Sequence, residues 1–165
     1  MEPVAFTLRN DKLLPCLITP CKVSQAYDSS SNTPRPISIE VKGLWDTGAS
    51  CTVITKEAAN KLGIQPITQS ITYHAQGESL VNIYFINVIL PNGIDIMGIK
   101  ASEGKLSGFD VLIGMDVINC GDFSITHRNN GTVFSFQIPS THEYDFVKQI
   151  DNSKTLSKPK QKKKR

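Results

Sequence analysis

The sequence predicts a domain built mainly of β-strands, with one or two short helices. Runs rich in Val, Ile, Phe and Tyr recur along the chain, and residues that favour turns, chiefly Asn, Asp, Gly and Pro, separate them. Only one segment, residues 55–63, carries both the start and the stop signal of a helix. The chain has 165 residues, of which 39% are hydrophobic and 20% charged, so it can bury a core of ordinary size. We expect one domain over residues 1–150.

The first expected strands lie on either side of a polar loop. Short apolar runs at 4–6 and 13–18 are separated by a turn-forming Asn-Asp pair, and each predicts a strand. Residues 28–36 are polar, with two prolines and three consecutive serines, and predict an exposed loop. Residues 37–41 alternate apolar with polar side chains, as a half-buried strand does. This strand leads directly to Asp46, which we therefore place at a strand end.

The middle of the chain predicts one short helix followed by two long hairpins. Thr55 can accept a hydrogen bond from the first turn of a helix, and Gly63 can end that helix in a left-handed conformation. Residues 67–99 are dense in β-branched and aromatic residues, apart from breaks at 75–78 and 91–93. Both breaks contain glycine, so we expect a turn at each of them.

Three further segments complete the expected strands. Residues 83–90 are apolar on both faces, which predicts a strand that is covered on two sides or that lies in a subunit interface. Residues 111–114 form a second apolar run that ends in glycine, and we expect a helical turn after it. Residues 132–138 alternate as a last strand, after a turn at 129–131.

The charge is divided between an acidic body and a basic end. Residues 154–165 hold 7 of the 18 basic residues and no acidic one, so the rest of the chain carries 11 basic against 15 acidic residues, a net charge of −4. Residues 151–165 offer almost no apolar side chain to offset the entropy of ordering, so we expect a disordered Lys-rich tail. No aromatic residue alternates with these lysines. We expect a solubilising tail, with binding of nucleic acid or another anionic surface as a weaker alternative.

The cysteines and the apolar runs argue against several other classes of protein. The four cysteines form no Cys-x-x-Cys pair and have no His at ligand spacing, so we predict neither a zinc site nor any other metal or cofactor. Cys51 is interpreted as a small buried thiol rather than as a nucleophile. No run approaches the roughly 18 apolar residues of a membrane span, so we expect no membrane partner. The N-terminus shows no secretory signal, which favours a cytoplasmic location.

The most informative stretch is 43–50, in which an apolar run delivers Asp46 into a tight turn with Thr47 and Gly48. A pair of carboxylates about 3 Å apart can share one proton, because like charge keeps both from ionising, and acid and base then coexist. The sequence contains no second Asp-Thr-Gly or Asp-Ser-Gly. If Asp46 is catalytic, its partner comes from another copy of the chain, so the motif predicts a symmetric homodimer.

The surroundings of the motif strengthen this interpretation. Ala49 and Ser50 follow it, and a Leu-Ile-Gly run at 112–114 comes later, with a glycine-tipped hairpin between the two. Over about residues 37–138 the chain resembles the retropepsins, the single-lobed dimeric aspartic proteases of retroviruses. The Gly-Met-Asp run at 114–116 is similar to that of their bacterial and cellular relatives. The resemblance implies a single-lobed acid-protease fold that homodimerisation completes, and it implies an aspartic endopeptidase.

The same resemblance implies a role for each residue of the motif. Asp46, together with its copy in the second subunit, would activate a water molecule for attack on a peptide carbonyl, without becoming a covalent nucleophile. Thr47 would hydrogen-bond across the dimer beneath the two carboxylates and hold them coplanar. Gly48 would leave room for the substrate backbone, and its carbonyl would accept a substrate amide.

The resemblance also implies which residues contact the substrate. The turn at 74–78 resembles the flap, a hairpin that closes over bound peptide and excludes water, although it holds fewer glycines than viral flaps. Leu112 corresponds to a wall of the substrate site, and Ser50 stands where the viral enzymes carry an acidic residue. His74 has a second interpretation as an ordinary exposed strand residue. The residues implied to bind substrate are Ala49, Ser50, His74, Ala75, Gln76, Gly77 and Leu112.

Alternatives to the protease interpretation remain. A metal site formed by Asp46 with Asp110 and Asp116 is disfavoured, because hard cations prefer several oxygen ligands from one loop. Asp116 is instead expected to cap the turn after Gly114. A β-rich domain in which Asp-Thr-Gly is merely a turn is disfavoured by the paired Leu-Ile-Gly run. The principal alternative is a catalytically silent retropepsin-like dimer that binds peptides. In either case the partners are a second copy of the chain and a peptide or protein.

Overall fold

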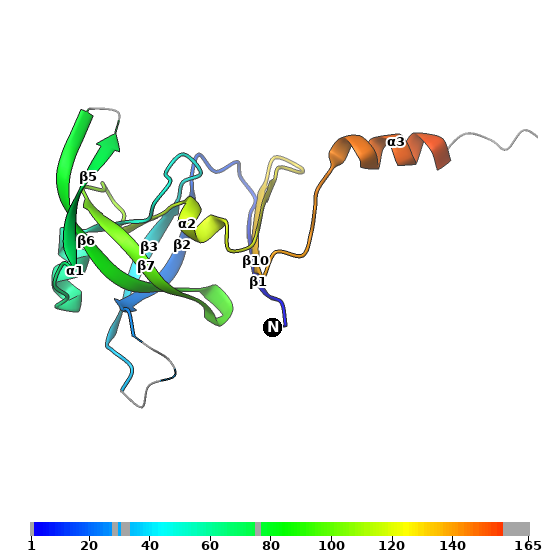
Figure 1. The fold of residues 1–165 in the computed structure, drawn as a ribbon. Helices are drawn as coiled ribbons and strands as arrows, with labels where there is room; N and C mark the ends of the chain where they lie inside the picture. The colour runs from blue at the N-terminus through cyan, green and yellow to red at the C-terminus, as the bar shows by residue number, and fades with distance from the viewer. Residues whose placement is uncertain (1, 28–29, 31–33, 75–76, 157–165) are drawn as a thin grey trace, which may run out of the picture.

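Strands make up most of the structure, as the sequence predicts. The computed structural model describes residues 2–27, 30, 34–74 and 77–156, and its strands form two sheets (Figure 1). In chain order the elements are β1 (Val4–Asn10), β2 (Leu17–Gln25), β3 (Ser38–Trp45), β4 (Val53–Thr55), α1 (Lys56–Leu62), β5 (Thr68–His74), β6 (Gly77–Leu90), the 3₁₀ turn η1 (Pro91–Gly93), β7 (Ile94–Gly104), β8 (Val111–Ile113), α2 (Met115–Ile118), β9 (Asp122–Thr126), β10 (Thr132–Ile138) and α3 (Phe146–Leu156).

The larger sheet closes on itself. Its seven strands follow the order β2-β3-β8-β4-β7-β6-β5, and β2 also pairs with β6. This extra pairing joins β2, the first strand of the order, to β6, the last but one. Six strands therefore form a closed barrel, and β5 lies outside it. β3 and β8 run parallel within the barrel, with Leu44 opposite Leu112 and Trp45 opposite Ile113. Because the carboxyl ends of parallel strands meet at one edge, the turn after β3 lies beside the turn after β8.

The smaller sheet packs against the barrel through aromatic side chains. It consists of β1, β10 and β9, all antiparallel to their neighbours. The ring of Trp45, from the barrel, lies 5.0 Å from Phe136, 5.1 Å from Phe134, 5.8 Å from Phe123 and 6.3 Å from Phe6, measured between ring centroids. All four Phe residues come from the smaller sheet. Burial of these large apolar surfaces holds the two sheets together.

The predicted helix and the turns predicted at 91–93 and 129–131 are confirmed, whereas residues 75 and 76 of the turn expected at 75–78 lie outside the described residues. The side chain of Thr55 accepts a hydrogen bond from the backbone N–H of Ala58 at 3.2 Å, and Gly63 ends α1 with a φ of 67°. The turn at 91–93 is η1, and residues 129–131 form the turn between β9 and β10. Local signals of capping and chain reversal were therefore sufficient at these places.

The two predicted hairpins share a strand. β6 pairs with β5 on one side and with β7 on the other, so the region is a three-stranded meander rather than two separate hairpins. β6 is 14 residues long, and its second half also pairs with β2. Ile86 and Val88 are fully buried there. The apolar run at 83–90 is thus part of the barrel.

The structure differs from the prediction in the N-terminal strands and in two short ones. The second strand was expected at 13–18 but begins at Leu17, because the preceding loop is held by side-chain bonds: Leu14 N–H donates to Thr132 Oγ1 at 2.9 Å. Leu13 and Leu14 are exposed in that loop. β4 and β9 were not predicted. With three and five residues, they are too short for alternation to distinguish them from loops.

The C-terminal region also differs from the prediction. Residues 151–156 were expected to begin a disordered tail, but they form the second half of α3. Asp145 Oδ1 accepts the N–H of Lys148 at 2.9 Å and so caps the helix, and Lys154 Nζ lies 3.8 Å from Asp151 Oδ1 one turn away. Such local bonds can favour a helix without a core. α3 stands away from both sheets (Figure 1), and the rest of the tail, 157–165, lies outside the described residues.

No helix in the part of the chain that the structure describes is both long and apolar enough to cross a membrane. The predicted loop at 28–36 lies mostly outside the described residues; residues 34–36 of it belong to no strand or helix.

Candidate active site

Asp46 lies immediately after β3, as predicted, and its backbone extends the ladder between β3 and β8. Its N–H donates to the carbonyl of Ile113 at 3.0 Å. The chain then turns sharply: the N–H of Gly48 donates to Asp46 Oδ1 at 2.8 Å, and the N–H of Ala49 donates to the Asp46 carbonyl at 3.3 Å. The residue is half-buried. The turn therefore orients the carboxylate while leaving it accessible at the surface of the single chain.

A residue far along the chain anchors the loop that carries Asp46. Both oxygens of Asp116 accept hydrogen bonds from Thr52: Oδ1 from the hydroxyl at 2.8 Å and Oδ2 from the N–H at 2.9 Å. The Thr52 hydroxyl in turn accepts the N–H of Gly114 at 3.3 Å, and the N–H of Met115 donates to the Ala49 carbonyl at 2.8 Å. Thr52 is fully buried. These bonds fasten the loop between β3 and β4 to the start of α2.

The expected role of Asp116 needs a correction. It was expected to cap the turn after Gly114, but Gly114 itself is the N-cap residue of α2, and glycine has no side chain with which to cap the helix. Asp116 lies in the first helical turn, where its carboxylate accepts the N–H of Val117 at 3.0 Å as well as the two groups of Thr52. Its principal contacts therefore join the start of α2 to the loop between β3 and β4. Patterns among neighbouring residues do not reveal such a long-range contact.

Gly114 allows the close approach of the two loops. A Cβ built on it would lie 2.6 Å from the carbonyl carbon of Cys51 and 3.0 Å from the carbonyl oxygen of Ala49. These are backbone atoms, so they cannot move away by a change of side-chain rotamer. Cys51 was expected to be buried, but it is exposed, because its backbone rather than its side chain packs against Gly114.

The other predicted site residues fall into two groups. Thr47 and Ser50 are exposed beside Asp46, Ala49 is half-buried in the same loop, and Leu112 is half-buried in β8. His74 and Gly77 pair at the far end of the β5–β6 hairpin, where Gly77 has a φ of 119°. Ala75 and Gln76 lie outside the described residues. The structure thus brings the motif loop and Leu112 together, and places the expected flap two strands beyond β4 in the same sheet.

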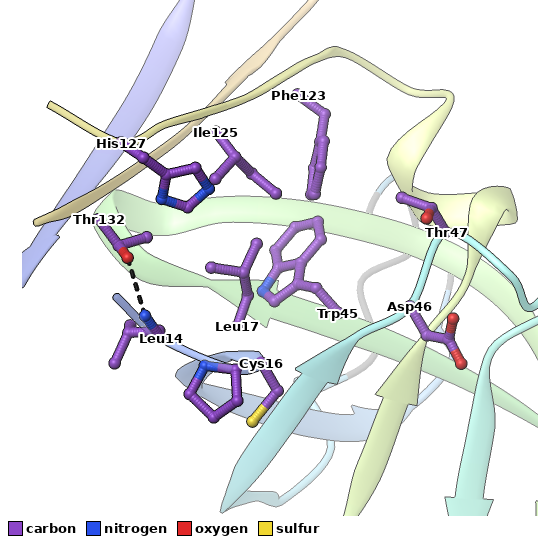
Figure 2. A pocket seen from close by; sticks show the side chains of 11 residues that line it. Leu14, Cys16, Leu17, Trp45, Asp46, Thr47, Phe123, Ile125, His127 and Thr132 are labelled. Carbon is purple, nitrogen blue, oxygen red and sulfur yellow. Dashed lines mark hydrogen bonds between the residues drawn. The ribbon is translucent and has the colours of Figure 1, made fainter. Parts of the chain in front are cut away.

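A cavity lies on the other side of the Asp46 turn, and no pattern in the sequence indicates it. It has a volume of about 240 Å³ and is lined by Leu14, Pro15, Cys16, Leu17, Trp45, Asp46, Thr47, Phe123, Ile125, His127 and Thr132. Figure 2 shows the Asp46 carboxylate pointing away from the Trp45 ring and from the apolar wall of this cavity. Trp45 is held by a hydrogen bond from its Nε1 to the buried Thr19 Oγ1 at 3.0 Å. The lining comes from β2, β3, β9, β10 and the loops next to them, whose proximity depends on the packing of the two sheets.

The carboxylates considered for a metal site serve separate backbone groups. Asp110 Oδ2 accepts the N–H of Lys42 at 2.9 Å, Asp116 binds Thr52, and Asp46 binds Gly48. Among the described residues, no three His, Cys, Asp or Glu side chains are grouped so that they could hold a metal ion.

The cysteines differ in their surroundings. Burial, with a smaller effect from Asp110, raises the pKa of the Cys21 thiol to about 12, so this thiol stays protonated. Burial also raises the pKa of Cys120, and the nearby Asp116 adds to the effect. All four cysteines are free. A raised pKa makes Cys21 and Cys120 poor nucleophiles.

Comparison with known proteins identifies the family. The chain is similar to a retropepsin-like aspartic protease from Rickettsia conorii, with 18% sequence identity and a TM-score of 0.51, over 82% of this chain and 95% of that one. It is also similar to the retroviral protease-like domain of Ddi1 from Leishmania major, with 18% identity and a TM-score of 0.47, over 81% of this chain and 100% of that one. No curated protein sequence matches the chain. The similarity to the Rickettsia conorii structure shows that the fold is retropepsin-like. The sequence model of the family described as gag-polyprotein putative aspartyl protease matches residues 38–120, and the chain belongs to that family.

Proposed function

We propose that this chain is an aspartic endopeptidase that acts as a homodimer, with Asp46 of each copy forming the catalytic pair. The observation that carries the proposal is the geometry of Asp46. Asp46 follows a half-buried strand and sits in a turn closed by the Gly48 N–H, and its carboxylate points away from the cavity wall. The family and the fold support the same assignment.

In the proposed reaction the two carboxylates share one proton. The ionised Asp46 accepts a proton from water as the water oxygen attacks the peptide carbonyl, and the protonated copy donates its proton to the carbonyl oxygen. Collapse of the tetrahedral intermediate then breaks the C–N bond: the carboxyl that took the proton from water gives it to the leaving nitrogen, and its copy takes a proton from a hydroxyl of the intermediate, so the pair again holds one proton. Neither carboxylate bonds covalently to the substrate, and the reaction as proposed uses no metal or cofactor.

The neighbouring residues would position the pair. Thr47 is exposed beside Asp46 in the single chain, where a second copy could receive its hydrogen bond. Gly48, also exposed, presents a backbone that a substrate can approach. Ala49, Ser50 and Leu112 lie next to the motif and would contact the substrate, and His74, Ala75, Gln76 and Gly77 would do so from the flap.

We propose that the protease domain spans residues 1–150 and that the Lys-rich end is accessory. Seven basic and no acidic residues at 154–165 would favour contact with anionic surfaces, weakened by salt. The four free cysteines suit a reducing compartment, so we propose a cytoplasmic location.

The second candidate is a catalytically silent dimer that binds peptides. One experiment separates it from the protease: cleavage of a mixed peptide library by the wild-type protein and by Asp46→Asn from acidic to neutral pH, with dimerisation followed by sedimentation. General acid–base catalysis contributes at least about 100-fold, so the variant should lose at least that much activity and keep its dimer. Equal cleavage by both proteins would refute the assignment of Asp46. A dimer of wild-type protein that cuts no peptide would favour the silent module.

A further inference from the structure

The strand register determines which side chains share a face of the sheet with Asp46. Residues directly opposite each other on paired strands project to the same face. A row of such partners crosses the sheet from β3 to β5 and consists of Leu44, Leu112, Val53, Ser102, Ile83 and Thr68. Asp46 lies two residues after Leu44, and its N–H continues the ladder to β8. We call the side shared by this row and Asp46 the Asp46 face.

The other side of the same strands faces the core. Trp45, Ile113, Ile54, Ala101 and Tyr84 are the alternate residues on β3, β8, β4, β7 and β6, and each is 6% exposed or less. On the Asp46 face the side chains nearest the motif, Leu44, Leu112 and Val53, are only half-buried. The Asp46 face is therefore the side on which a ligand could lie.

The β5–β6 hairpin presents hydroxyl groups on the Asp46 face. Alternation from Thr68 places Ser70 and Thr72 on that face, and their partners on β6 are Val81 and Ser79. Three of these four side chains end in a hydroxyl. The hairpin is therefore polar on the side where a peptide bound at Asp46 would pass.

The exposed large apolar side chains near the end of the hairpin lie on its opposite face. Ile71 pairs with Leu80 across the two strands, and Tyr73 is the next residue of that face on β5. They are 51%, 66% and 82% exposed, respectively. A hairpin that covers apolar side chains of a substrate would carry its large apolar residues on the Asp46 face. Here they lie on the opposite face, so the hairpin does not suit an apolar substrate.

The hydrogen bonds that the three hydroxyls of β5 donate within the chain are long. Thr72 Oγ1 lies 3.5 Å from the Ser79 carbonyl, Ser70 Oγ lies 3.5 Å from the Ile71 carbonyl, and Thr68 Oγ1 lies 3.4 Å from the Gln69 carbonyl. Good O–H···O bonds are about 2.7–2.8 Å. Exchanging such bonds for shorter ones to a ligand would cost little.

We infer that the substrate carries small polar side chains, namely Ser, Thr, Asn or Gln, at the positions that lie against the hairpin, where Thr72 and Ser79 hydrogen-bond them. This inference rests on the proposed peptide site at Asp46. An extended peptide turns alternate side chains to opposite sides, so the remaining positions face Leu44, Leu112 and Val53 and accept apolar residues. In a symmetric dimer the same polar preference recurs on both sides of the scissile bond.

Binding of a peptide library tests the inference without requiring turnover. The parent protein is Asp46→Asn, which binds peptides without cutting them, and the test protein adds Thr72→Val and Ser79→Ala. The control adds Ile71→Thr, which places a hydroxyl on the opposite face of the same hairpin. The peptides that each protein retains are sequenced, and sedimentation confirms that all three proteins form the same dimer.

The peptides retained by the parent protein should be enriched in small polar residues over Val, Ile and Leu at one or two positions. The enrichment should be about tenfold, because one hydrogen bond changes affinity by about that factor. The double variant should lose this preference, and the control should keep it. A parent that enriches aliphatic residues there, a double variant with an unchanged profile, or a library from which no peptide is enriched would each overturn the inference.

Cleavage of the same library with Asp46 restored separates this inference from the proposed function. Peptides that bind with the polar preference but are never cut would refute the endopeptidase and leave the inference standing. Peptides that are cut with an aliphatic preference at the hairpin positions would support the endopeptidase and refute the inference.

Discussion

Gly114 illustrates how a single residue determines the shape of the Asp46 loop. A side chain at this position would press against the backbone of Cys51 at 2.6 Å, and that backbone is anchored by the bonds of Thr52 to Asp116. Gly43 offers a matched comparison, since a Cβ there would meet the Cδ1 atom of Ile113 at 2.8 Å. That atom is the end of a side chain, so it can move where a peptide group cannot.

We predict that Gly114→Ala lowers the free energy of unfolding by about 3 kcal/mol, at the upper end of overpacking costs, and abolishes peptide cleavage. Gly43→Ala should lower the free energy of unfolding by less, and this variant should still cleave peptides. Urea denaturation of both variants measures the difference. Equal losses at the two positions would show that the contact with Cys51 does not matter.

Thr47 should act between subunits rather than within one. Because its side chain is exposed in the single chain, Thr47→Ala should change the free energy of unfolding of the separated subunit by no more than about 0.5 kcal/mol. It should nevertheless weaken the dimer and lower activity. Sedimentation equilibrium, denaturation at low concentration and peptide cleavage test these effects, with Asn60→Ala, an exposed residue of α1 that is not assigned to the site, as the control. A large loss of subunit stability with unchanged dimerisation would contradict the proposed role.

At the scale of elements, the start of β9 holds the segment that follows β10. The Asp122 carboxylate accepts hydrogen bonds from the Ser140 hydroxyl, from the Thr141 N–H at 3.0 Å, and from the His142 N–H at 3.1 Å, and it lies 2.9 Å from His142 Nδ1. These bonds, the one from Ser140 first, hold the pKa of Asp122 well below its ordinary value. The ionised carboxylate is therefore the form that binds the segment.

This shift predicts how stability depends on pH. The ordinary pKa of an Asp is about 3.9, and the folded state holds that of Asp122 lower, so the unfolded state binds more protons as the pH falls through this range. The stabilisation is present above the ordinary pKa and is lost as the pH falls from there toward the lower pKa of the folded state.

Asp122→Asn should consequently have a lower melting temperature than wild type at pH 7. The difference in melting temperature should become smaller as the pH falls below about 4. Thermal denaturation from pH 7 to pH 2 measures it, with Asp151→Asn, an exposed residue of α3, as the control. Limited proteolysis should also cut the variant at 139–145 faster than wild type. A difference in melting temperature that does not change with pH would show that ionisation of the Asp122 carboxylate is not the cause of the stabilisation.

The second half of α3 and the residues after it should be dispensable for catalysis. α3 stands apart from both sheets, and Phe146, Val147 and Ile150 on it are exposed. Deleting residues 152–165 should therefore leave peptide cleavage within about twofold of wild type, because no residue assigned to the site is removed. Deleting 139–165 instead removes the partners of Asp122 and should lower the melting temperature. Loss of activity on the shorter deletion would assign a catalytic or dimer-forming role to the end of the chain.

At the scale of the whole molecule, one chain contains half of the proposed site. Activity should then depend on dimer concentration, so the rate per chain should fall on dilution below the dimer dissociation constant, as sedimentation at the same concentrations would show. The rate should also fall on both sides of a pH optimum, because either gain or loss of the shared proton inactivates the pair. A rate per chain that is constant on dilution, or one independent of pH, would contradict the shared site.

Much of the local structure could be predicted from the sequence. Thr55 and Gly63 marked the ends of α1, alternation identified β3, and the position of Asp46 at a strand end followed from that strand. Each of these features depends on residues only a few positions apart. Backbone sterics and hydrogen bonding act at that range, so the pattern of the sequence is sufficient.

The tertiary structure alone decided how distant segments meet. Asp116 binds Thr52 across 64 positions, Cys51 turns outward because Gly114 packs on its backbone, and the cavity beside Asp46 forms where the smaller sheet meets the barrel. Thr72 shares a face with Asp46 only because four intervening strands keep a continuous register. The sequence by itself determined the motif and its turn, and it predicts a second carboxylate from another copy of the chain. Register and sheet packing, which depend on the whole set of long-range contacts, decided what surrounds that carboxylate.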